Sequence, residues 1–408
     1  MVAGRRYFGM DVHKRHITVA AMDGEHEIVV KPRTIQTERF WKWARKHLRP
    51  TDVVAIEASA DTWYYYDELS KLAGEVAVAN TAQMGRVGSR RVKTDKRDAL
   101  ALAKSLAAKM LPRVWVPPEH VRQLRSLTAH RRRLVRDRAA AKNRLHSILR
   151  RYHLQTPAGD PFSQKNEKWW LELDIPQVAQ LRVRHELVHF QHLRQLLAET
   201  DAEIARLSAS AQWVNEVVFL IQLPGISLIS AMTILGAIGM IERFESASKL
   251  VGYAGLGASV HASGDTHRTG KITKEGRREL RAGLTECAWV AVRHSAYWQA
   301  QYEKLSRRLG KPKAITVIAR KLLVTIWHVL SKREVNRHGD IQRIARSFMT
   351  WATEYRLASS LDLPRLEFVR QQLARLGLKQ PIEQMRYGSR DYVLAYPGEE
   401  ANDSELAT

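Results

Sequence analysis

The sequence predicts an α/β domain followed by a mostly helical remainder, and three features of its pattern support this prediction. Short runs of β-branched residues alternate with helical stretches from about residue 6 to residue 108. Beyond residue 120 the pattern changes to long arginine-rich helices, and beyond residue 217 to apolar helices interrupted by Pro and Gly. A chain of 408 residues is also too long for one core, so two or three domains are expected.

The α/β domain is predicted to contain strands, two intervening helices and a final helix within residues 90–107. Three strands come first, and helix and strand then alternate twice, which is typical of a sheet covered by helices. The segment VWVPP at residues 114–118 interrupts the pattern after the final helix. The expected strands are residues 7–12, 17–23, 27–35, 52–58 and 75–80, and the expected helices are residues 38–48 and 63–72.

Two long arginine-rich helices are predicted next, over residues 120–151 and 177–210. Their apolar residues are widely spaced, which favours a coiled-coil arm or a dimer contact. The segment PAGDPFSQKN between them is predicted to be a loop.

The third region begins with VVFLIQLPGISLISAMTILGAIG, residues 217–239. Its apolar stretches flank Pro224 and Gly225, so we expect two short helices joined by a tight hairpin, an element like a helix-hairpin-helix whose amides can meet phosphate. Residues 253–276 are rich in Gly, Ser and Thr and are expected to form a loop. Further helices are expected at 277–294, 313–330 and 366–376, before an acidic, disordered tail at 398–408.

The charge of the chain favours nucleic acid as its partner. There are 66 Lys and Arg against 42 Asp and Glu, a formal net charge of +24. A polyanion would offset this self-repulsion, and an anionic membrane surface is the weaker interpretation. We find no apolar run of about 18 residues and no signal-peptide pattern. The single cysteine, Cys287, excludes an internal disulfide and a multi-cysteine metal site. A soluble cytoplasmic protein is therefore expected.

Four carboxylates stand out because of where they occur. Asp11 lies inside the first strand between apolar residues, and Glu57 ends the strand VVAIE. Asp95 and Asp98 lie one turn apart at the start of a helix within a basic run; capping of that helix is the simpler interpretation of the pair. If the two strands are neighbours and the helix crosses the sheet, all four would meet, and Mg²⁺ is the usual ion between such groups beside phosphates. Two such ions can activate a nucleophile and stabilise a leaving oxygen.

The order of these motifs resembles a known family. GMDVHKRHITVA, VVAIEAS and VKTDKRDALALA resemble the Asp, Glu and paired-Asp signatures of the DEDD insertion-sequence transposases, and residues 223–288 resemble the second domain of that family. The resemblance implies a RuvC-like ribonuclease H fold and DNA recombination by a dimer or tetramer, guided by a structured noncoding bridge RNA. It also implies that Asp11, Glu57, Asp95 and Asp98 are catalytic Mg²⁺ ligands and that a serine of the second domain attacks the DNA.

Ser263 is the serine that this resemblance favours. The family carries a Ser-Ser-Gly-Gly-like loop, and the corresponding residues here are His261-Ala262-Ser263-Gly264-Asp265, so Ala262 and Asp265 depart from it. Ser263 keeps the second serine and is preferred to Ser259, although a serine in a Gly-rich segment is ordinarily a turn former. Residues expected to hold the nearby phosphate are Lys271, Lys274 and Arg277.

The arm contributes a second expected nucleic-acid contact and one misleading motif. Arg131, Arg132 and Arg133 lie in its densest basic run and are predicted to bind DNA or RNA backbone with a steep salt dependence. The run HELVH at residues 185–189 matches the zinc-protease pattern, and His192 follows it. We interpret this run as a solvated helix face, because its surroundings are polar and rich in arginine.

The resulting hypothesis is a DNA transposase of four segments. These are a RuvC-like catalytic domain (1–112), a helical coiled-coil arm (113–212), a transposase domain with the serine loop (213–331) and a helical extension with an acidic tail (332–408). One alternative is a RuvC-like nuclease or resolvase that uses the carboxylates with water as nucleophile. The other is a basic nucleic-acid-binding protein with no catalytic activity.

Overall fold

The computed structural model describes residues 4–80, 83, 94–263, 266–378 and 382–394. The chain divides into two compact units, Met1–Pro117 and Pro118–Thr408. The predicted α/β character of the first unit and helical character of the second are both confirmed.

The first unit is built on a mixed six-stranded sheet with the order β3-β2-β1-β4-β5-β6. The central strand β1 (Tyr7–Val12) pairs antiparallel with β2 (His16–Met22) and parallel with β4 (Val53–Glu57). Strands β3 (Ile28–Gln36) and β5 (Glu75–Ala79) lie outside these, and all five longer strands fall where the sequence predicts them. The short β6 (Arg113–Val114) was not predicted, because its two residues belong to the segment interpreted as a break.

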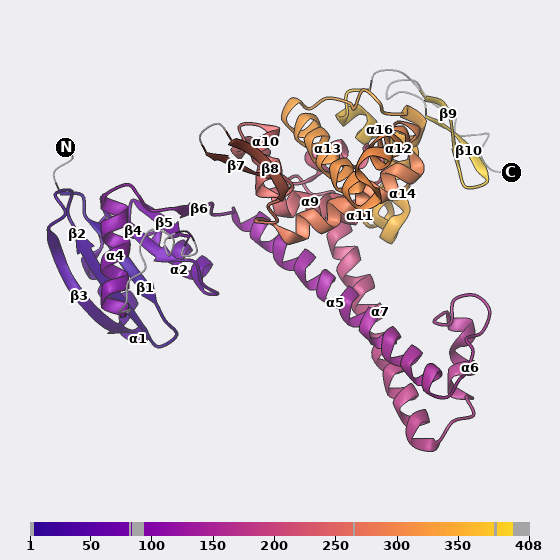
Figure 1. Ribbon diagram of the computed structural model, residues 1–408, viewed down its shortest axis with the longest axis horizontal. Helices are drawn as coiled ribbons and strands as arrows, with labels where there is room; N and C mark the ends of the chain where they lie inside the picture. The colour runs from indigo at the N-terminus through magenta and orange to yellow at the C-terminus, as the bar shows by residue number, and fades with distance from the viewer. Residues whose placement is uncertain (1–3, 81–82, 84–93, 264–265, 379–381, 395–408) are drawn as a thin grey trace. The chain divides into compact units, whose positions relative to one another are not determined.

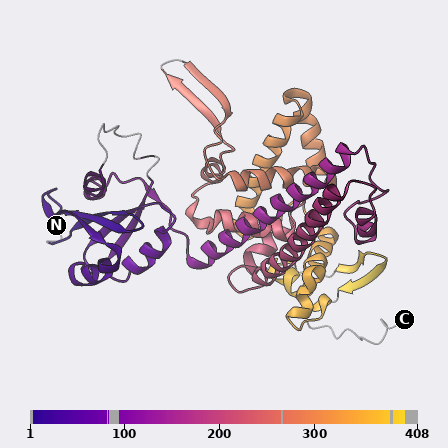
Figure 2. The same cartoon turned by 90° about the horizontal axis from the view of Figure 1, so that it is seen from below.

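Helices cover both faces of this sheet (Figure 2). Helices α1 (Thr37–His47) and α2 (Thr62–Leu69) pack on one face, and α4 (Asp95–Ala107) packs on the other. Alternation along the strands separates the two cores. The α1–α2 side buries Phe8, Met10, Val54, Ile56, Phe40, Trp43, Tyr65 and Leu69. The α4 side buries Val53, Ala55, Ala77, Ala79, Leu102 and Leu106.

Gly9 allows α4 to lie directly against the backbone of β1. A Cβ atom at Gly9 would lie 2.0 Å from the Ala99 carbonyl oxygen and 2.5 Å from the Ala103 amide nitrogen. Any side chain at this position would therefore push the helix away from the strand. Ala99 and Ala103 are fully buried, so small residues on the helix and glycine on the strand together set this close contact.

Two long helices open the second unit and lie side by side (Figure 1). They are α5 (Glu119–Arg151) and α7 (Gln177–Ser208), which confirms the two predicted helices; coiled-coil geometry stays a prediction. Between them, a 3-10 turn (Gln164–Asn166) ends the segment PAGDPFSQKN expected to be a loop, and α6 (Glu167–Leu171) follows directly after it. The shared core is Leu134, Ala141, Leu145, Ile148, Phe162, Trp170, Val183, Leu187, Phe190, Leu193 and Leu197.

Two helices, α8 (Val214–Ile221) and α9 (Leu228–Ile238), occur on either side of Pro224 and Gly225 as expected, and a helix-hairpin-helix element stays a prediction. Gly225 at the turn has a φ of +83°, and a Cβ there would lie 2.3 Å from the Cys287 carbonyl oxygen. The turn therefore packs against α11 (Arg278–His294). Three more helices complete this region, namely α10 (Ala247–Tyr253), α12 (Ala296–Leu309) and α13 (Lys311–Lys332). Helix α13 is long and apolar enough to cross a membrane by composition, but it contacts α10, α11 and α12 and half of that stretch is buried.

Part of the segment expected to be a loop is a β-hairpin instead. Strands β7 (Ala258–Ser263) and β8 (Thr266–Ile272) pair antiparallel, with Ser263 opposite Thr266. The expectation weighted Gly and Ser too heavily, because β-branched residues also recur through this segment and favour a strand.

The last part of the described chain contains α14 (Ile341–Thr353), α15 (Leu357–Ser360) and α16 (Arg365–Arg375), of which α16 was predicted. A second hairpin follows, formed by β9 (Ile382–Tyr387) and β10 (Arg390–Leu394), which was not expected in a helical extension. The acidic tail predicted to be disordered, residues 398–408, lies outside the described residues.

We expect Gly9→Ala to destabilise the first unit by at least about 3 kcal/mol. Overpacking against side chains typically costs about 1–3 kcal/mol, and here the obstacle is helix backbone, which cannot rotate away. Thermal unfolding followed by circular dichroism measures the effect. Gly24→Ala is the matched control, because a Cβ there would meet nothing within 4 Å. Equal unfolding temperatures for the two variants would contradict the close contact.

Candidate functional site

Asp11 and Glu57 occupy adjacent positions on one face of the sheet. The last paired residues of the parallel strands β1 and β4 are Met10 and Ile56, and Asp11 and Glu57 each come one residue later. Because side chains alternate along a strand, Asp11 points to the same face as Gly9, and Glu57 to the same face as Ala55. This is the face that α4 covers, as the contacts of Gly9 show.

The N-terminal turn of α4 brings the other two carboxylates to this place. Thr94 caps the helix, its side chain accepting a hydrogen bond from the Arg97 amide, and Asp95 and Asp98 lie in the first turn. Both carboxylates act electrostatically on Asp11 and raise the pKa of that residue. His13 Nε2 lies 3.0 Å from Asp11 and 3.6 Å from Asp95, so these two carboxylates are close together, and the meeting of all four stays a prediction. The interpretation of the two aspartates as caps is wrong, because Thr94 is the cap; both aspartates nevertheless lie in the first turn, where the helix dipole favours negative charge.

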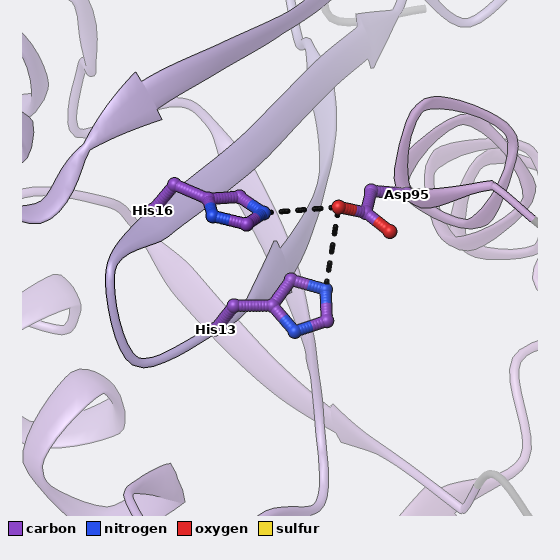
Figure 3. Close-up of side chains that lie close together, drawn as sticks. All are labelled: His13, His16 and Asp95. Carbon is purple, nitrogen blue, oxygen red and sulfur yellow. Dashed lines mark hydrogen bonds and ion pairs between the residues drawn. The ribbon is translucent and has the colours of Figure 1, made fainter.

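Two histidines that sequence reasoning did not single out complete the group. His13 lies in the turn between β1 and β2, and His16 begins β2. His16 Nε2 lies 2.9 Å from Asp95 Oδ2 (Figure 3). His13 Nε2 lies 3.0 Å from Asp11 Oδ2 and 3.6 Å from Asp95 Oδ2. The available signal was the His-x-x-His spacing across a strand turn directly after Asp11.

The pKa values of Asp11 and Asp95 are shifted in opposite directions, the first upward by burial and the second downward by hydrogen bonding. Burial is the largest effect on Asp11, whose side chain is 9% exposed, and it raises the pKa of this carboxyl. The hydrogen bond with His13 opposes burial, while the charges of Asp95 and Asp98 add to it. Asp95 is 46% exposed, and its hydrogen bond with His16 lowers its pKa. A buried carboxylate beside two others is therefore the electrostatically costly member of the group.

The residues predicted around the serine are only partly described. Ser263 ends β7, but its side chain, the side chain of Lys271, and all of Gly264 and Asp265 lie outside the part of the chain that the structure describes. The Ser259 hydroxyl faces the Gly270 backbone across the hairpin, since a Cβ at Gly270 would lie 2.3 Å from it. Lys274 is exposed in the segment that follows β8.

Arg277, predicted to contact phosphate, belongs to an internal network that sequence reasoning missed. Its Nε donates to the Tyr253 hydroxyl at 2.9 Å, and that hydroxyl donates to the Ala237 carbonyl at 3.1 Å. Arg125 donates to the carbonyls of Gly236 and Ala237 at 2.6 and 2.9 Å. These donors satisfy the carbonyl groups at the C-terminus of α9, where cations are favoured. Burial lowers the pKa of Arg125 to about 10, with a smaller contribution from Arg277.

The three arm arginines differ in their surroundings. Arg131 forms a part-buried ion pair and hydrogen bonds with Asp201 on α7. Arg132 lies 3.5 Å from the Glu279 carboxylate, and its side chain is 53% exposed. Arg133 is exposed and has no ion pair with a described acidic residue. Of the three, Arg133 is thus the most available to an external phosphate.

The zinc-protease-like run on α7 resembles a solvated face, as expected. His185 and His189 are exposed, and Glu186 accepts a hydrogen bond of 2.6 Å from Arg144 on α5. Within the described parts of the chain, His13, His16 and Asp95 are the residues that form a group of three close metal-ligating side chains.

Comparison with known proteins adds family matches to this geometry. A transposase family model for DEDD proteins of the IS110 type matches residues 8–154, and a model described as transposase IS116/IS110/IS902 family matches residues 218–303. The chain is 28% identical over 300 residues to y4qE of Sinorhizobium fredii (strain NBRC 101917 / NGR234), covering 67% of this chain and 74% of that protein.

Two further relatives have descriptive names. The transposase for insertion sequence element IS1111A of Coxiella burnetii is 24% identical over 261 residues, covering 60% of this chain and 69% of that protein. The pilin gene-inverting protein of Moraxella bovis is 26% identical over 307 residues, covering 71% of this chain and 83% of that protein. The first family match contains the four carboxylates, and the second contains Ser263.

We expect Asp11→Asn to stabilise the metal-free protein at neutral pH. The folded-state pKa of Asp11 lies above its ordinary value of 3.8, so folding favours the protonated carboxyl. That favourable contribution is complete below about pH 3.8 and is lost as the pH rises through the folded-state pKa. The unfolding temperature of the variant should therefore exceed that of the wild type at pH 7, with a gap that narrows toward pH 4.

Asp52→Asn is the contrasting control for this prediction. Asp52 is fully buried and receives two hydrogen bonds from Arg6, at 3.0 and 2.7 Å. Removing its charge leaves the part-buried arginine without its partner and should cost about 3 kcal/mol. If Asp11→Asn lowered stability as Asp52→Asn does, Asp11 would be a structural ion-pair partner instead of a strained site carboxylate.

Proposed function

Because this chain belongs to the IS110-type DEDD transposases, we propose that it transposes an insertion sequence by cutting and rejoining DNA at a metal-dependent carboxylate site. The observation that carries the proposal is the adjacency of Asp11 and Glu57 on the sheet face that α4 covers. The electrostatic action of Asp95 and Asp98 on Asp11 adds the remaining pair of the set. DNA is therefore the substrate that the site and the family favour together.

We assign Asp11, Glu57, Asp95 and Asp98 as the ligands of Mg²⁺. The donor set fits a hard divalent cation, because carboxylate oxygens are its preferred ligands and a cation would offset the repulsion that raises the pKa of Asp11. When bound, the ion supplies the charge that activates a nucleophile and stabilises a leaving oxygen. The strand order β3-β2-β1-β4-β5 with α4 on one face supports a RuvC-like ribonuclease H fold for this domain.

The residues of the chain contribute position and exclusion of water. Gly9 fixes the distance between β1 and α4, so Asp95 and Asp98 are held by backbone contact and not by flexible side chains. Burial shields the Asp11 carboxyl from bulk water, and His13 orients this group through a contact of 3.0 Å. His16 orients Asp95 in the same way. Such supporting contacts hold catalytic groups within the narrow range that reaction requires.

Ser263 is assigned as the nucleophile. It is the last residue of β7 and pairs with Thr266 at the start of β8. Ser259 is disfavoured, because its hydroxyl faces Gly270 within the hairpin. A serine ester with DNA conserves the energy of the broken phosphodiester bond, so the strand can be rejoined without an external energy source. Among the exposed cations that the structure describes, Lys274 is the nearest to Ser263 in sequence, and we assign it to bind the phosphate.

The partners and the remaining segments are assigned on the same basis. The formal net charge of +24 supports DNA and a structured guide RNA as partners, and the long α5–α7 pair supports a dimer or tetramer contact. We propose the same division of this part of the chain as before, into an arm (113–212), a serine domain (213–331) and an extension (332–408). The α8–α9 hairpin supports a helix-hairpin-helix-like contact with phosphate, and the alternative function is a resolvase in which water replaces Ser263.

Covalent capture of DNA tests the proposal. We expect Ser263 to become linked to one strand of end-labelled element DNA when Mg²⁺ and the cognate RNA are present, giving a shifted band on a denaturing gel. Ser263→Ala should bind DNA but form no adduct, and Asp11→Asn and Asp98→Asn should lose the adduct while keeping RNA binding. Peptide mapping identifies the linked residue.

Ser259→Ala is the matched control and should retain the adduct. Free cleaved ends without an adduct, together with cutting that survives Ser263→Ala, would favour the resolvase. Wild-type activity in Asp98→Asn would mean that this aspartate serves only the helix terminus.

The arm arginines should separate into a structural residue and a binding residue. We expect Arg133→Ala to keep its unfolding temperature and to reduce the slope of log K against log salt by about 1, as for one lost phosphate contact. Arg131→Ala should instead destabilise the protein by about 3 kcal/mol, because Asp201 would lose its part-buried partner. Filter binding across a salt series and thermal unfolding distinguish these outcomes. An unchanged slope in Arg133→Ala would remove this part of the arm from the interface.

A further inference from the structure

We propose that His13, His16 and Asp95 form a binding site for a transition-metal ion of the Zn²⁺ class. The site differs from the carboxylate set because two of its three donors are imidazole nitrogens. His13 and His16 come from the two ends of the β1–β2 turn, and Asp95 comes from the first turn of α4 (Figure 3). Two segments that are far apart in sequence, the β1–β2 turn and the start of α4, thus converge on one point.

The spacing of the donors suits a tetrahedral ion. His16 Nε2 lies 2.9 Å and His13 Nε2 lies 3.6 Å from Asp95 Oδ2, and all three ligand atoms lie within 4.8 Å of one another. Zinc bonds to nitrogen and oxygen of about 2.0–2.2 Å place neighbouring ligands of a tetrahedral ion about 3.3 Å apart. The two observed separations lie on either side of that value, so small side-chain rotations complete the site.

The way the side chains point also favours an ion over an ordinary hydrogen bond. Both rings turn the Nε2 atom toward the same carboxylate oxygen, and His13 Nε2 also faces Asp11 Oδ2 at 3.0 Å. His16 hydrogen-bonds Asp95 and His13 hydrogen-bonds Asp11, and His13 Nε2 in addition lies 3.6 Å from the Asp95 oxygen that His16 contacts. Two imidazole nitrogens and a carboxylate oxygen that lie this close together are the donor types that bind a transition-metal ion.

Donor type separates this site from the proposed Mg²⁺ ligands. Imidazole suits Zn²⁺, Co²⁺, Ni²⁺ and Cu²⁺, whereas Mg²⁺ prefers oxygen donors and dehydrates reluctantly. Access is also available, because the side chains of His13, His16 and Asp95 are 44%, 31% and 46% exposed. An ion can therefore enter from solvent without unfolding of the sheet.

Shared use of Asp95 gives the site a consequence for activity, which rests on the proposed function. An ion held by His13 and His16 takes Asp95 from the carboxylate set, and it places a second positive charge beside Asp11. We therefore expect Zn²⁺ to inhibit the Mg²⁺-dependent reaction by competition for this residue. The metal binding itself requires neither DNA nor activity.

Titration of the full-length, tag-free protein with Co²⁺ tests the binding. The wild type should give the visible absorption bands of a tetrahedral cobalt site at one equivalent, and Zn²⁺ should abolish them. Excess Mg²⁺ should leave them in place, because it competes poorly for imidazole. His16→Ala and His13→Ala should each weaken Co²⁺ binding by at least about 100-fold, since loss of an outer partner of a ligand alone costs about 10–100-fold.

His189→Ala is the matched control, because His189 is exposed on α7 within the other histidine-rich run. It should bind Co²⁺ as the wild type does. Circular dichroism of the His13 and His16 variants checks that both are folded, and either folded variant is sufficient for the test. Retained cobalt bands in folded His16→Ala and His13→Ala, bands lost in His189→Ala, or bands displaced by Mg²⁺ would each overturn the site.

The activity measurement separates this inference from the proposed function. The ratio of reaction rates with and without Zn²⁺ should fall for the wild type and stay near one for His16→Ala. Cobalt binding with no DNA reaction in any variant would uphold the metal site and reject the transposase mechanism. A normal DNA reaction with no cobalt binding would reject the metal site and uphold the transposase mechanism.

Discussion

The backbone contact between Gly9 and α4 is the constraint on which the site depends. A Cβ atom at Gly9 would lie only 2.0 Å from the Ala99 carbonyl oxygen. Because glycine has no Cβ, the strand and the helix touch without intervening atoms. Asp11 lies two residues after Gly9 and therefore shares its face of the sheet. Asp95 lies four residues before Ala99, one turn along the helix. A single small residue thus sets the separation between carboxylates that are more than eighty positions apart in sequence.

This close packing explains why the site combines burial with charge. Fully buried Ala99 and Leu102 exclude water beneath α4, and Asp11 lies at the border of that dry layer. Desolvation raises the pKa of Asp11, whereas Asp95 at the exposed helix terminus has its pKa lowered by its hydrogen bond with His16. The site therefore offers one carboxylate that is costly to ionise next to one that ionises readily. A cation that binds to both recovers free energy mainly from the first.

Sequence patterns could predict the sheet because its strands are continuous apolar runs bounded by turns. The adjacency of Asp11 and Glu57 was predicted only on the condition that their strands are neighbours, and the parallel pairing of β1 with β4 meets that condition. The β7–β8 hairpin was missed, because its Gly and Ser residues favour a loop and outweighed the β-branched residues that recur between them. The role of His16 was also hidden, since its partner Asp95 is 79 residues away. Local periodicity reports burial, but contacts between segments depend on the assembled fold.

Contacts between segments also determine which arginines are available to a partner, and they change how the net charge should be interpreted. Several of them are used inside the protein. Arg6 neutralises buried Asp52, Arg125 donates to carbonyls at the end of α9, and Arg131 pairs with Asp201. A buried arginine with satisfied donors adds little to the field felt by a polyanion, because a phosphate would have to displace the internal acceptors first. The formal charge of +24 is therefore an upper bound on the charge available to nucleic acid. Exposed cations without such partners, of which Arg133 is one on the arm, determine where a phosphate backbone can bind.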